Sequence, residues 1–137
     1  MSGADDNDLL LGGPGRDTLN GEQCDDVLFS SGSDHDAAWS GGPGNDVLNG
    51  SAVTMDGGPD DDYIVNGFPR RGTTNGGDGD DLIVVTGEEE TINGGKGNDT
   101  IYAVNRSVDK IDCGPGLDTL YGDTNDKFKN CEKPILK

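Results

Sequence analysis

The chain has 137 residues, and its 27 acidic residues outnumber its 10 Lys and Arg residues to give a net charge of −17. Only 30% of the residues are hydrophobic, so an ordinary globular core is excluded unless bound cations neutralise the carboxylates and contribute to folding. The acidity argues against nucleic acid and anionic membrane surfaces as partners, and no apolar run approaches the roughly 18 residues of a membrane span.

Nine-residue repeats of the form G-G-x-G-x-D-x-U-x, where U is a large apolar residue, run along the chain from its start. Near-consensus copies occupy residues 12–20, 41–49, 76–84, 94–102 and 113–121, and weaker copies occupy 3–11, 21–29 and 57–65. Degenerate units of similar length lie between them. About fourteen units result, which predicts a single domain, residues 1–137, of about seven solenoid coils with two units each.

The chemistry of one unit follows from its positions. Glycine at positions one, two and four permits positive φ angles, position six supplies a carboxylate, and positions seven to nine form a short strand. Position eight then points inward and its two neighbours outward. The inward residues predicted for one sheet are Leu10, Leu28, Leu48, Ile64, Ile83, Ile101 and Leu120. Those of the other sheet are Leu19, Trp39, Met55, Thr74, Ile92, Ile111 and Phe128.

This pattern resembles the RTX (repeats-in-toxin) family of calcium-binding proteins over nearly the whole chain. The resemblance implies an all-β fold, a right-handed parallel β-roll, with Ca²⁺ held between stacked turns by Asp carboxylates and backbone carbonyls. The implied carboxylate ligands are Asp8, Asp17, Asp26, Asp36, Asp46, Asp62, Asp81, Asp99 and Asp118. The implied carbonyl ligands lie near Gly13, Gly15, Gly42, Gly44, Gly58, Gly77, Gly79, Gly95, Gly97, Gly114 and Gly116.

The spacing of the units predicts that calcium chemistry is concentrated on one edge. The units that start at residues 3, 21, 41, 57, 76, 94 and 113 are close to two nonapeptides apart, so they stack on the same edge. We expect about six ions there and about one on the other edge, in the unit at residues 12–20 or the one at 31–40. The alternative is that the degenerate turns reflect repeat decay alone. Because the core is only two side chains thick, about 1.5–3 kcal/mol per buried side chain is too little to order the chain, and folding should depend on calcium.

The outward faces of the two sheets differ. The first carries an apolar ribbon that offers a surface for self-association or docking, although strand propensity alone would also explain it. Its residues include Val27, Phe29, Tyr63, Val65, Leu82, Val84, Tyr102 and Tyr121. The second carries Thr and Asn residues and resembles the flat faces of ice-binding solenoids, but we favour a solvated sheet face with good β-propensity as its explanation.

The cysteines predict a staple at the C-terminal end. Cys113 and Cys131 are one full coil apart, and the spacing of about 4.8 Å between stacked strands suits a disulfide. A bridge indicates an oxidising environment, so we expect a secreted or cell-surface protein. Residues 127–134 are locally basic, and residues 122–137 are interpreted as the C-terminal cap. Cys24 has no stacked partner, which leaves a free thiol or an intermolecular bond, and His35 is a single residue that does not support a zinc site.

The predicted function is that of an extracellular calcium-binding β-roll that folds on binding Ca²⁺ and acts as a structural or interaction module. The sequence has no nucleophile elbow, P-loop or Ser/His/Asp set, so we do not expect an enzyme. Two alternatives remain open: a solenoid that binds ice, mineral or glycan through its Thr/Asn face, and an accessory domain of a secreted enzyme.

Overall fold

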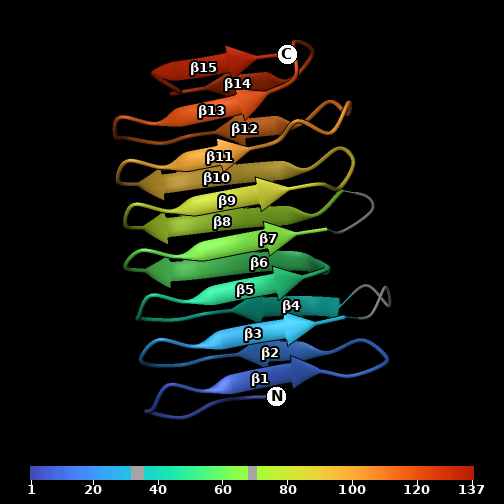
Figure 1. Cartoon of the computed structure of the whole chain (residues 1–137), viewed down its shortest axis with the longest axis vertical. Helices are drawn as coiled ribbons and strands as arrows, with labels where there is room; N and C mark the ends of the chain where they lie inside the picture. Colours follow the sequence, from blue (N-terminus) through green and yellow to red (C-terminus); the bar gives the residue numbers. More distant parts are fainter. Residues whose placement is uncertain (32–35, 68–70) are drawn as a thin grey trace.

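The computed structural model describes residues 1–31, 36–67 and 71–137, together with the backbone but not the side chain of Asp36. The described residues form fifteen strands in two parallel sheets, which the chain enters alternately as it winds into about seven stacked coils (Figure 1). The prediction of an all-β parallel solenoid is therefore confirmed.

Odd-numbered strands form the first sheet and even-numbered strands the second, in sequence order in both sheets. The first sheet contains β1 (Leu9–Gly12), β3 (Val27–Ser30), β5 (Val47–Gly50), β7 (Tyr63–Asn66), β9 (Leu82–Val85), β11 (Thr100–Tyr102), β13 (Thr119–Gly122) and β15 (Lys133–Leu136). The second sheet contains β2 (Thr18–Asn20), β4 (Asp36–Ser40), β6 (Ala52–Pro59), β8 (Thr73–Asp78), β10 (Thr91–Lys96), β12 (Lys110–Asp112) and β14 (Lys127–Lys129).

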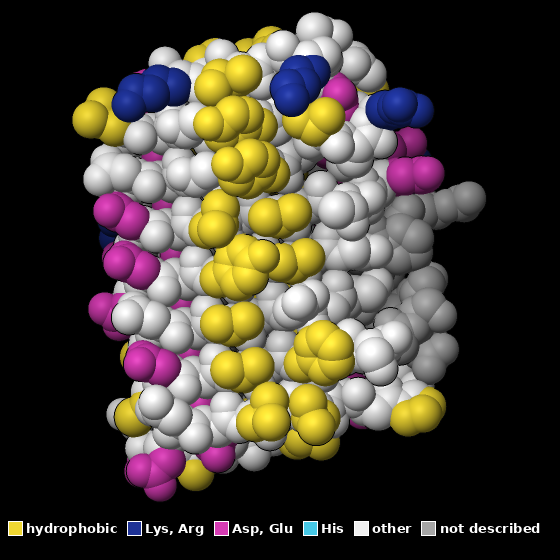
Figure 2. Space-filling view, in the orientation of Figure 1, with side chains coloured by type: hydrophobic (Ala, Val, Ile, Leu, Met, Phe, Trp, Pro, Cys, Tyr) yellow, Lys and Arg dark blue, Asp and Glu magenta, His cyan; other side chains and the backbone are white. Residues whose placement is uncertain are grey.

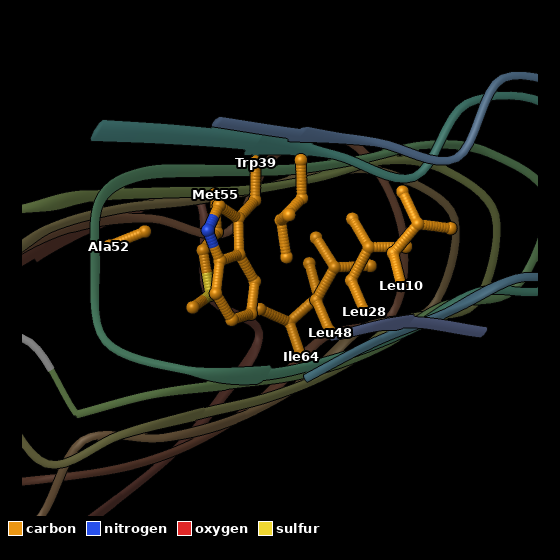
Figure 3. Packing of buried hydrophobic residues seen from close by; sticks show 8 residues of the cluster. Leu10, Leu28, Trp39, Leu48, Ala52, Met55 and Ile64 are labelled. Atoms are coloured by element: carbon orange, nitrogen blue, oxygen red, sulfur yellow. The ribbon is translucent and has the colours of Figure 1, made fainter. Parts of the chain in front are cut away.

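Two inward columns of side chains make the core, and the strand register aligns them as the repeat predicts. In the first sheet Leu10 pairs with Leu28, and the column continues in register to Leu120. In the second sheet the column runs from Leu19 through Trp39 to Ile111. Figure 3 shows the first column as a row of side chains that Trp39 faces from the opposite sheet. All these side chains are at most 3% exposed.

One polar residue within the core, Thr74, has a hydrogen-bond partner inside the solenoid. The Asn66 side-chain amide donates to Thr74 Oγ1 at 3.0 Å and to the Ala52 carbonyl at 3.2 Å. Both Asn66 and Thr74 are fully buried. This contact gives the buried threonine hydroxyl a hydrogen-bond partner. Without one, the buried hydroxyl would destabilise the fold.

The C-terminal end combines a disulfide with an additional strand. Cys113 and Cys131 are bonded, with Cα atoms 5.1 Å apart, which confirms the predicted staple. Strand β15 pairs with β13 and places Pro134, which has no backbone N–H, in register with Leu120 at the sheet edge. Phe128 is in register with Ile111 as predicted, but it is 37% exposed because β14 is the last strand of the second sheet.

The outer face of the first sheet carries the apolar ribbon as a continuous vertical column (Figure 2). Phe29, Tyr63 and Leu82 are each 37–40% exposed within it. The rings of Tyr102 and Tyr121 stack on each other with centroids 4.5 Å apart and an interplanar angle of 3°. The parallel register therefore converts outward positions of successive repeats into one apolar surface.

Candidate calcium-binding edges

The turns that precede the odd-numbered strands stack into one edge of the solenoid, which we name edge 1. At each level the backbone N–H of the position-six Asp donates to Oδ1 of the position-six Asp in the next coil. These bonds are 2.7–2.9 Å long and link Asp8, Asp26, Asp46, Asp62, Asp81, Asp99 and Asp118. The structure thus brings together on one edge seven of the nine predicted carboxylates.

The second oxygen of these carboxylates is buried without a hydrogen-bond partner in six of the seven residues. They are Asp26, Asp46, Asp62, Asp81, Asp99 and Asp118, and each is at most 3% exposed. Asp8 differs, since its Oδ2 accepts the Ala4 N–H at 2.7 Å in the largely exposed first turn. A buried carboxylate oxygen with neither proton donor nor cation is energetically unfavourable, so edge 1 is chemically incomplete as it stands.

The pKa values of the edge 1 carboxylates also indicate that their charged forms lack a stabilising partner. Burial raises the pKa of Asp62 to about 8 and that of Asp81 to about 7, and the neighbouring carboxylates add to the shift. Burial likewise raises the pKa of Asp46 and of Asp99 to about 6. The N–H from the preceding coil opposes these shifts but does not cancel them. A cation would stabilise the charged form of these groups.

The glycines of edge 1 bring backbone carbonyls next to these carboxylates. Gly77 has a φ of +132°, and a Cβ there would collide with the carbonyl oxygen of Gly58 in the preceding coil. The position-one glycines are constrained in another way, because a Cβ on Gly57 would collide with Oδ2 of Asp62. The same contacts recur along the edge, so glycine keeps open the space that carboxylate and carbonyl oxygens share.

The oxygen-only chemistry of edge 1 fits Ca²⁺. A hard cation prefers carboxylate and carbonyl oxygens, and each turn provides one buried carboxylate with several backbone carbonyls nearby. Within the described ranges, no three His, Cys, Asp or Glu side chains gather into a metal-binding cluster. Ligation at edge 1 would therefore depend on main-chain oxygens as much as on side chains, unlike a zinc site.

A second ladder on edge 1 was not predicted from the sequence. On edge 1, position five holds Asn or Asp in every unit before the last, where it is Leu117, and the Oδ1 of each accepts the N–H of the position-five residue in the following coil at 2.7–3.2 Å. The accepting residues are Asn7, Asp25, Asn45, Asp61, Asp80 and Asn98. The signal was present in the sequence as a recurrent Asn or Asp before the position-six Asp.

Glu132 ends the edge 1 ladder. The N–H of Asp118 donates to Glu132 Oε2 at 3.1 Å, in the way that each earlier Asp donates to the next coil. Glu132 lies only one residue after the disulfide-bonded Cys131, and no complete repeat surrounds it. Sequence reasoning missed this residue because it does not occupy position six of a recognisable unit.

Edge 2 is the opposite edge, formed by the turns that precede the even-numbered strands, and it contains two of the predicted ligands. Asp17 is half-buried before β2. Asp36 begins β4, where its backbone pairs with Ala52, but its side chain lies outside the described residues. Residues 34 and 35 of the same predicted turn also lie outside them. The structure therefore places Asp17 and Asp36 away from the seven carboxylates of edge 1.

The C-terminal half of edge 2 has its own ladder of buried acids. The Glu90 N–H donates to Asp109 Oδ1 at 2.8 Å, and the Asp109 N–H donates to Asp126 Oδ1 at 2.9 Å. Protein donors also complete the second oxygens of the two aspartates: the Asn105 amide donates to Asp109 at 2.9 Å, and the Asp123 N–H donates to Asp126 at 2.7 Å. These two carboxylates need no cation to be satisfied.

Glu90 is the exception on edge 2. It is fully buried, and neither of its oxygens accepts a hydrogen bond of normal geometry. Burial raises its pKa to about 7, the nearby Gly72 backbone opposes the rise, and the charge of Asp109 adds to it. The longer glutamate side chain thus lies beside the Gly72 backbone. It has no counterpart of the Asn105 amide that donates to Asp109.

The fold and these edges define a class of protein: a parallel β-solenoid whose buried carboxylates stack beside backbone carbonyls. The family model of the RTX calcium-binding nonapeptide repeat matches residues 2–34, 40–68 and 85–103, which is more than half of the chain. The chain therefore belongs to the RTX calcium-binding repeat family and is a calcium-binding structural module. Comparison with curated proteins and with solved structures gave no match. The described part of the chain has no helix long and apolar enough to cross a bilayer.

Proposed function

We propose that this protein is a secreted or cell-surface module that folds on binding Ca²⁺ and then serves in adhesion or assembly. The observation that carries the proposal is the set of six buried Asp carboxylates on edge 1, each with an oxygen that has no partner. Unfolding would return these groups to water, whereas calcium would neutralise them in place. The Cys113–Cys131 disulfide supports an oxidising location outside the cell.

The proposed ligands are the position-six carboxylates of edge 1 and the carbonyls of its turns. About six ions would lie between successive turns of edge 1, and about one would lie near Asp17 on edge 2. About seven Ca²⁺ ions would bring about +14 charges against the chain's −17. Near-complete neutralisation would remove most of the repulsion that opposes compact folding.

Calcium titration of the chelated protein tests this proposal. We expect far-UV circular dichroism to change from a largely unfolded to a β-rich spectrum, cooperatively, as Ca²⁺ is added. Equilibrium dialysis of the folded protein should find about seven bound ions. Magnesium serves as the control, because its strict octahedral geometry and tight hydration suit these turns poorly. A fully folded chain in excess chelator would contradict the proposal.

The apolar ribbon is the proposed surface for self-association. It is continuous along the first sheet, flanked by the acidic residues of edge 1 (Figure 2). Calcium would lower the charge repulsion between copies and so favour contact between ribbons. We expect sedimentation velocity to show a dimer or larger species in calcium and a monomer after replacement of Tyr63 and Leu82 by serine. A strictly monomeric calcium-loaded protein at high concentration would rule this surface out.

A further inference from the structure

The outer face of the second sheet is hollowed near its C-terminal end. One hollow, of about 840 Å³, lies where the turns of edge 2 meet this face and is lined by Arg71, Thr73, Thr91, Arg106 and Lys110 among others. A second, of about 450 Å³, continues from Thr91 and Lys110 toward Lys127, Phe128 and Lys129. Because they share Thr91 and Lys110, the two hollows form one extended depression across the last coils.

Basic side chains gather along this depression although the chain as a whole is strongly acidic. We name the five of them, Arg71, Arg106, Lys110, Lys127 and Lys129, the basic track. The acidic residues that line the same depression are Glu88, Glu89 and Asp112. Glu89 pairs with Arg71 and Asp112 pairs with Lys129. The basic residues therefore outnumber the acidic ones only locally, at this place on the surface.

The strand register sets two lysines of the track directly opposite each other. Lys110 of β12 pairs in register with Lys127 of β14, and both side chains are exposed. Like charges opposite each other in a sheet are destabilising. Neither lysine, nor Arg106, forms an ion pair with any residue in the described ranges, despite the surplus of carboxylates. An anion lying between these side chains would remove the repulsion.

The other lining groups narrow the chemistry of that anion. Thr73, Thr91 and Ser107 offer hydroxyls, and Asn93 offers an amide beside them. Phe128 also lines the second hollow, but its register with the buried Ile111 places it on the inward side of the sheet. Hydroxyl, amide and cationic groups together match a sugar chain that carries acidic substituents. A long polyanion such as nucleic acid would meet the acidic remainder of the molecule, whereas a short one is screened from it beyond roughly 8 Å at physiological salt.

We propose that the basic track binds an acidic oligosaccharide, with carboxylate or sulfate groups on Arg106, Lys110 and Lys127 and sugar hydroxyls beside Thr91 and Asn93. The size of the two hollows suits a ligand of several rings. The site is separate from edge 1, and it uses no calcium ligand proposed above. Its failure and the failure of calcium-dependent folding would therefore be distinguishable.

Isothermal titration of the calcium-loaded protein at fixed free calcium tests the track. The probes are a sulfated tetrasaccharide, a uronic acid tetrasaccharide, neutral maltotetraose, inorganic sulfate and a short DNA duplex. We expect at least one acidic tetrasaccharide to bind at least about tenfold more tightly than maltotetraose or sulfate. The two acidic probes distinguish sulfate from carboxylate as the recognised group.

A matched pair of variants assigns any binding to the track. Lys110→Gln with Lys127→Gln should weaken the acidic tetrasaccharide at least about tenfold, whereas Lys133→Gln with Lys137→Gln, which removes the same charge elsewhere, should change affinity less than about twofold. Equal losses in both lysine pairs, no binding of either acidic probe, or tighter binding of duplex DNA would overturn the proposal. Circular dichroism verifies that each variant is folded.

Discussion

At edge 1 the buried Oδ2 of Asp62 has no partner, whereas at edge 2 the equally buried Asp109 receives the Asn105 amide on the corresponding oxygen. Both aspartates lie in stacked turns, and both accept an N–H from the preceding coil on Oδ1. The two edges therefore share one backbone arrangement and differ in what completes the carboxylate. At Asp109 a protein side chain completes it, whereas at Asp62 no protein group does, and we propose that a cation takes that place.

This difference shows that a turn without the repeat consensus need not be the remnant of a calcium site. It can be a turn whose buried carboxylate is bonded by protein groups. The turn at residues 103–109 lacks the glycines of the consensus, and Asn105 bonds to Gly87, Ser107 and Asp109 in their place. The solenoid is therefore asymmetric. On edge 1 six of the seven position-six carboxylates keep a buried oxygen without a hydrogen-bond partner, whereas on edge 2 protein donors complete Asp109 and Asp126 but not Glu90.

Among the tests of this contrast between the edges, we expect the largest effect when the calcium-free, chelated protein is acidified and its β-structure is measured. The raised pKa values of Asp46, Asp62, Asp81 and Asp99 mean that the folded state binds protons more tightly than the unfolded state. Their contribution to stability is complete below the unfolded pKa of about 4 and is lost as the pH rises through about 6–8. Protons should therefore partly replace calcium.

We expect circular dichroism in chelator to show increasing β-structure as the pH falls from 8 to 5. In calcium the same acidification should weaken ion binding, so the difference between the calcium-loaded and chelated samples should narrow. Glu90, whose pKa is raised to about 7, should contribute in the same direction from edge 2. Loss of structure in the chelated sample over this pH range would show that the buried carboxylates do not control folding.

A smaller effect should separate matched carboxylates on the two edges. Asp62→Asn removes a proposed ligand, so the calcium concentration for half-folding should rise several-fold and about one ion should be lost. Asp109→Asn opposes two amide groups and should cost about 1–2 kcal/mol in the calcium-loaded protein without changing the number of ions. Equilibrium dialysis and denaturant titration measure both quantities. Equal loss of ions from both variants would remove the distinction between the edges.

The smallest effect should come from the donor on edge 2. Asn105→Ala leaves the Asp109 oxygen without its amide and should cost about 1 kcal/mol in calcium-saturated protein. The control is Asn93→Ala, because Asn93 bonds Asn75 at 2.7 Å on the partly exposed sheet face and should cost less than about 0.5 kcal/mol. Urea denaturation compares the two variants. A cost no larger for Asn105 than for Asn93 would mean that Asp109 is satisfied in another way.

Much of the fold could be predicted because the same nine-residue pattern, with its turn and its short strand, recurs along the chain. A period of nine residues with an apolar position eight fixes which side chains point inward, and Leu28, Ile64 and Ile101 lie where the pattern puts them. The disulfide followed from the same period, since one coil of separation brings Cys113 beside Cys131. The stacking on a single edge of the units that start at residues 3, 21, 41, 57, 76, 94 and 113 also followed, because each coil contains two units.

The parts that were missed depend on contacts that no period describes. Asn105 reaches across to Asp109 from a degenerate turn, and Glu132 accepts an N–H from a tail without a complete repeat. The exposed basic track arises because Lys110, Lys127 and the turn residues Arg71 and Arg106 come from four different segments. Each of these residues alone is an ordinary surface charge. Only the stacking of the coils brings them together along one depression.

The sequence by itself determined the solenoid, its register and the edge on which most position-six aspartates gather. The physical reason is that one repeat buries too little alone, so equivalent positions of successive repeats must stack on one another. Only the tertiary structure decided which buried oxygens have protein partners. That choice depends on side chains one coil away, at distances near 3 Å that sequence separation does not encode. The same nonapeptide geometry therefore leaves a buried oxygen without a protein partner at Asp62, where we propose a cation, and gives the corresponding oxygen of Asp109 a protein donor.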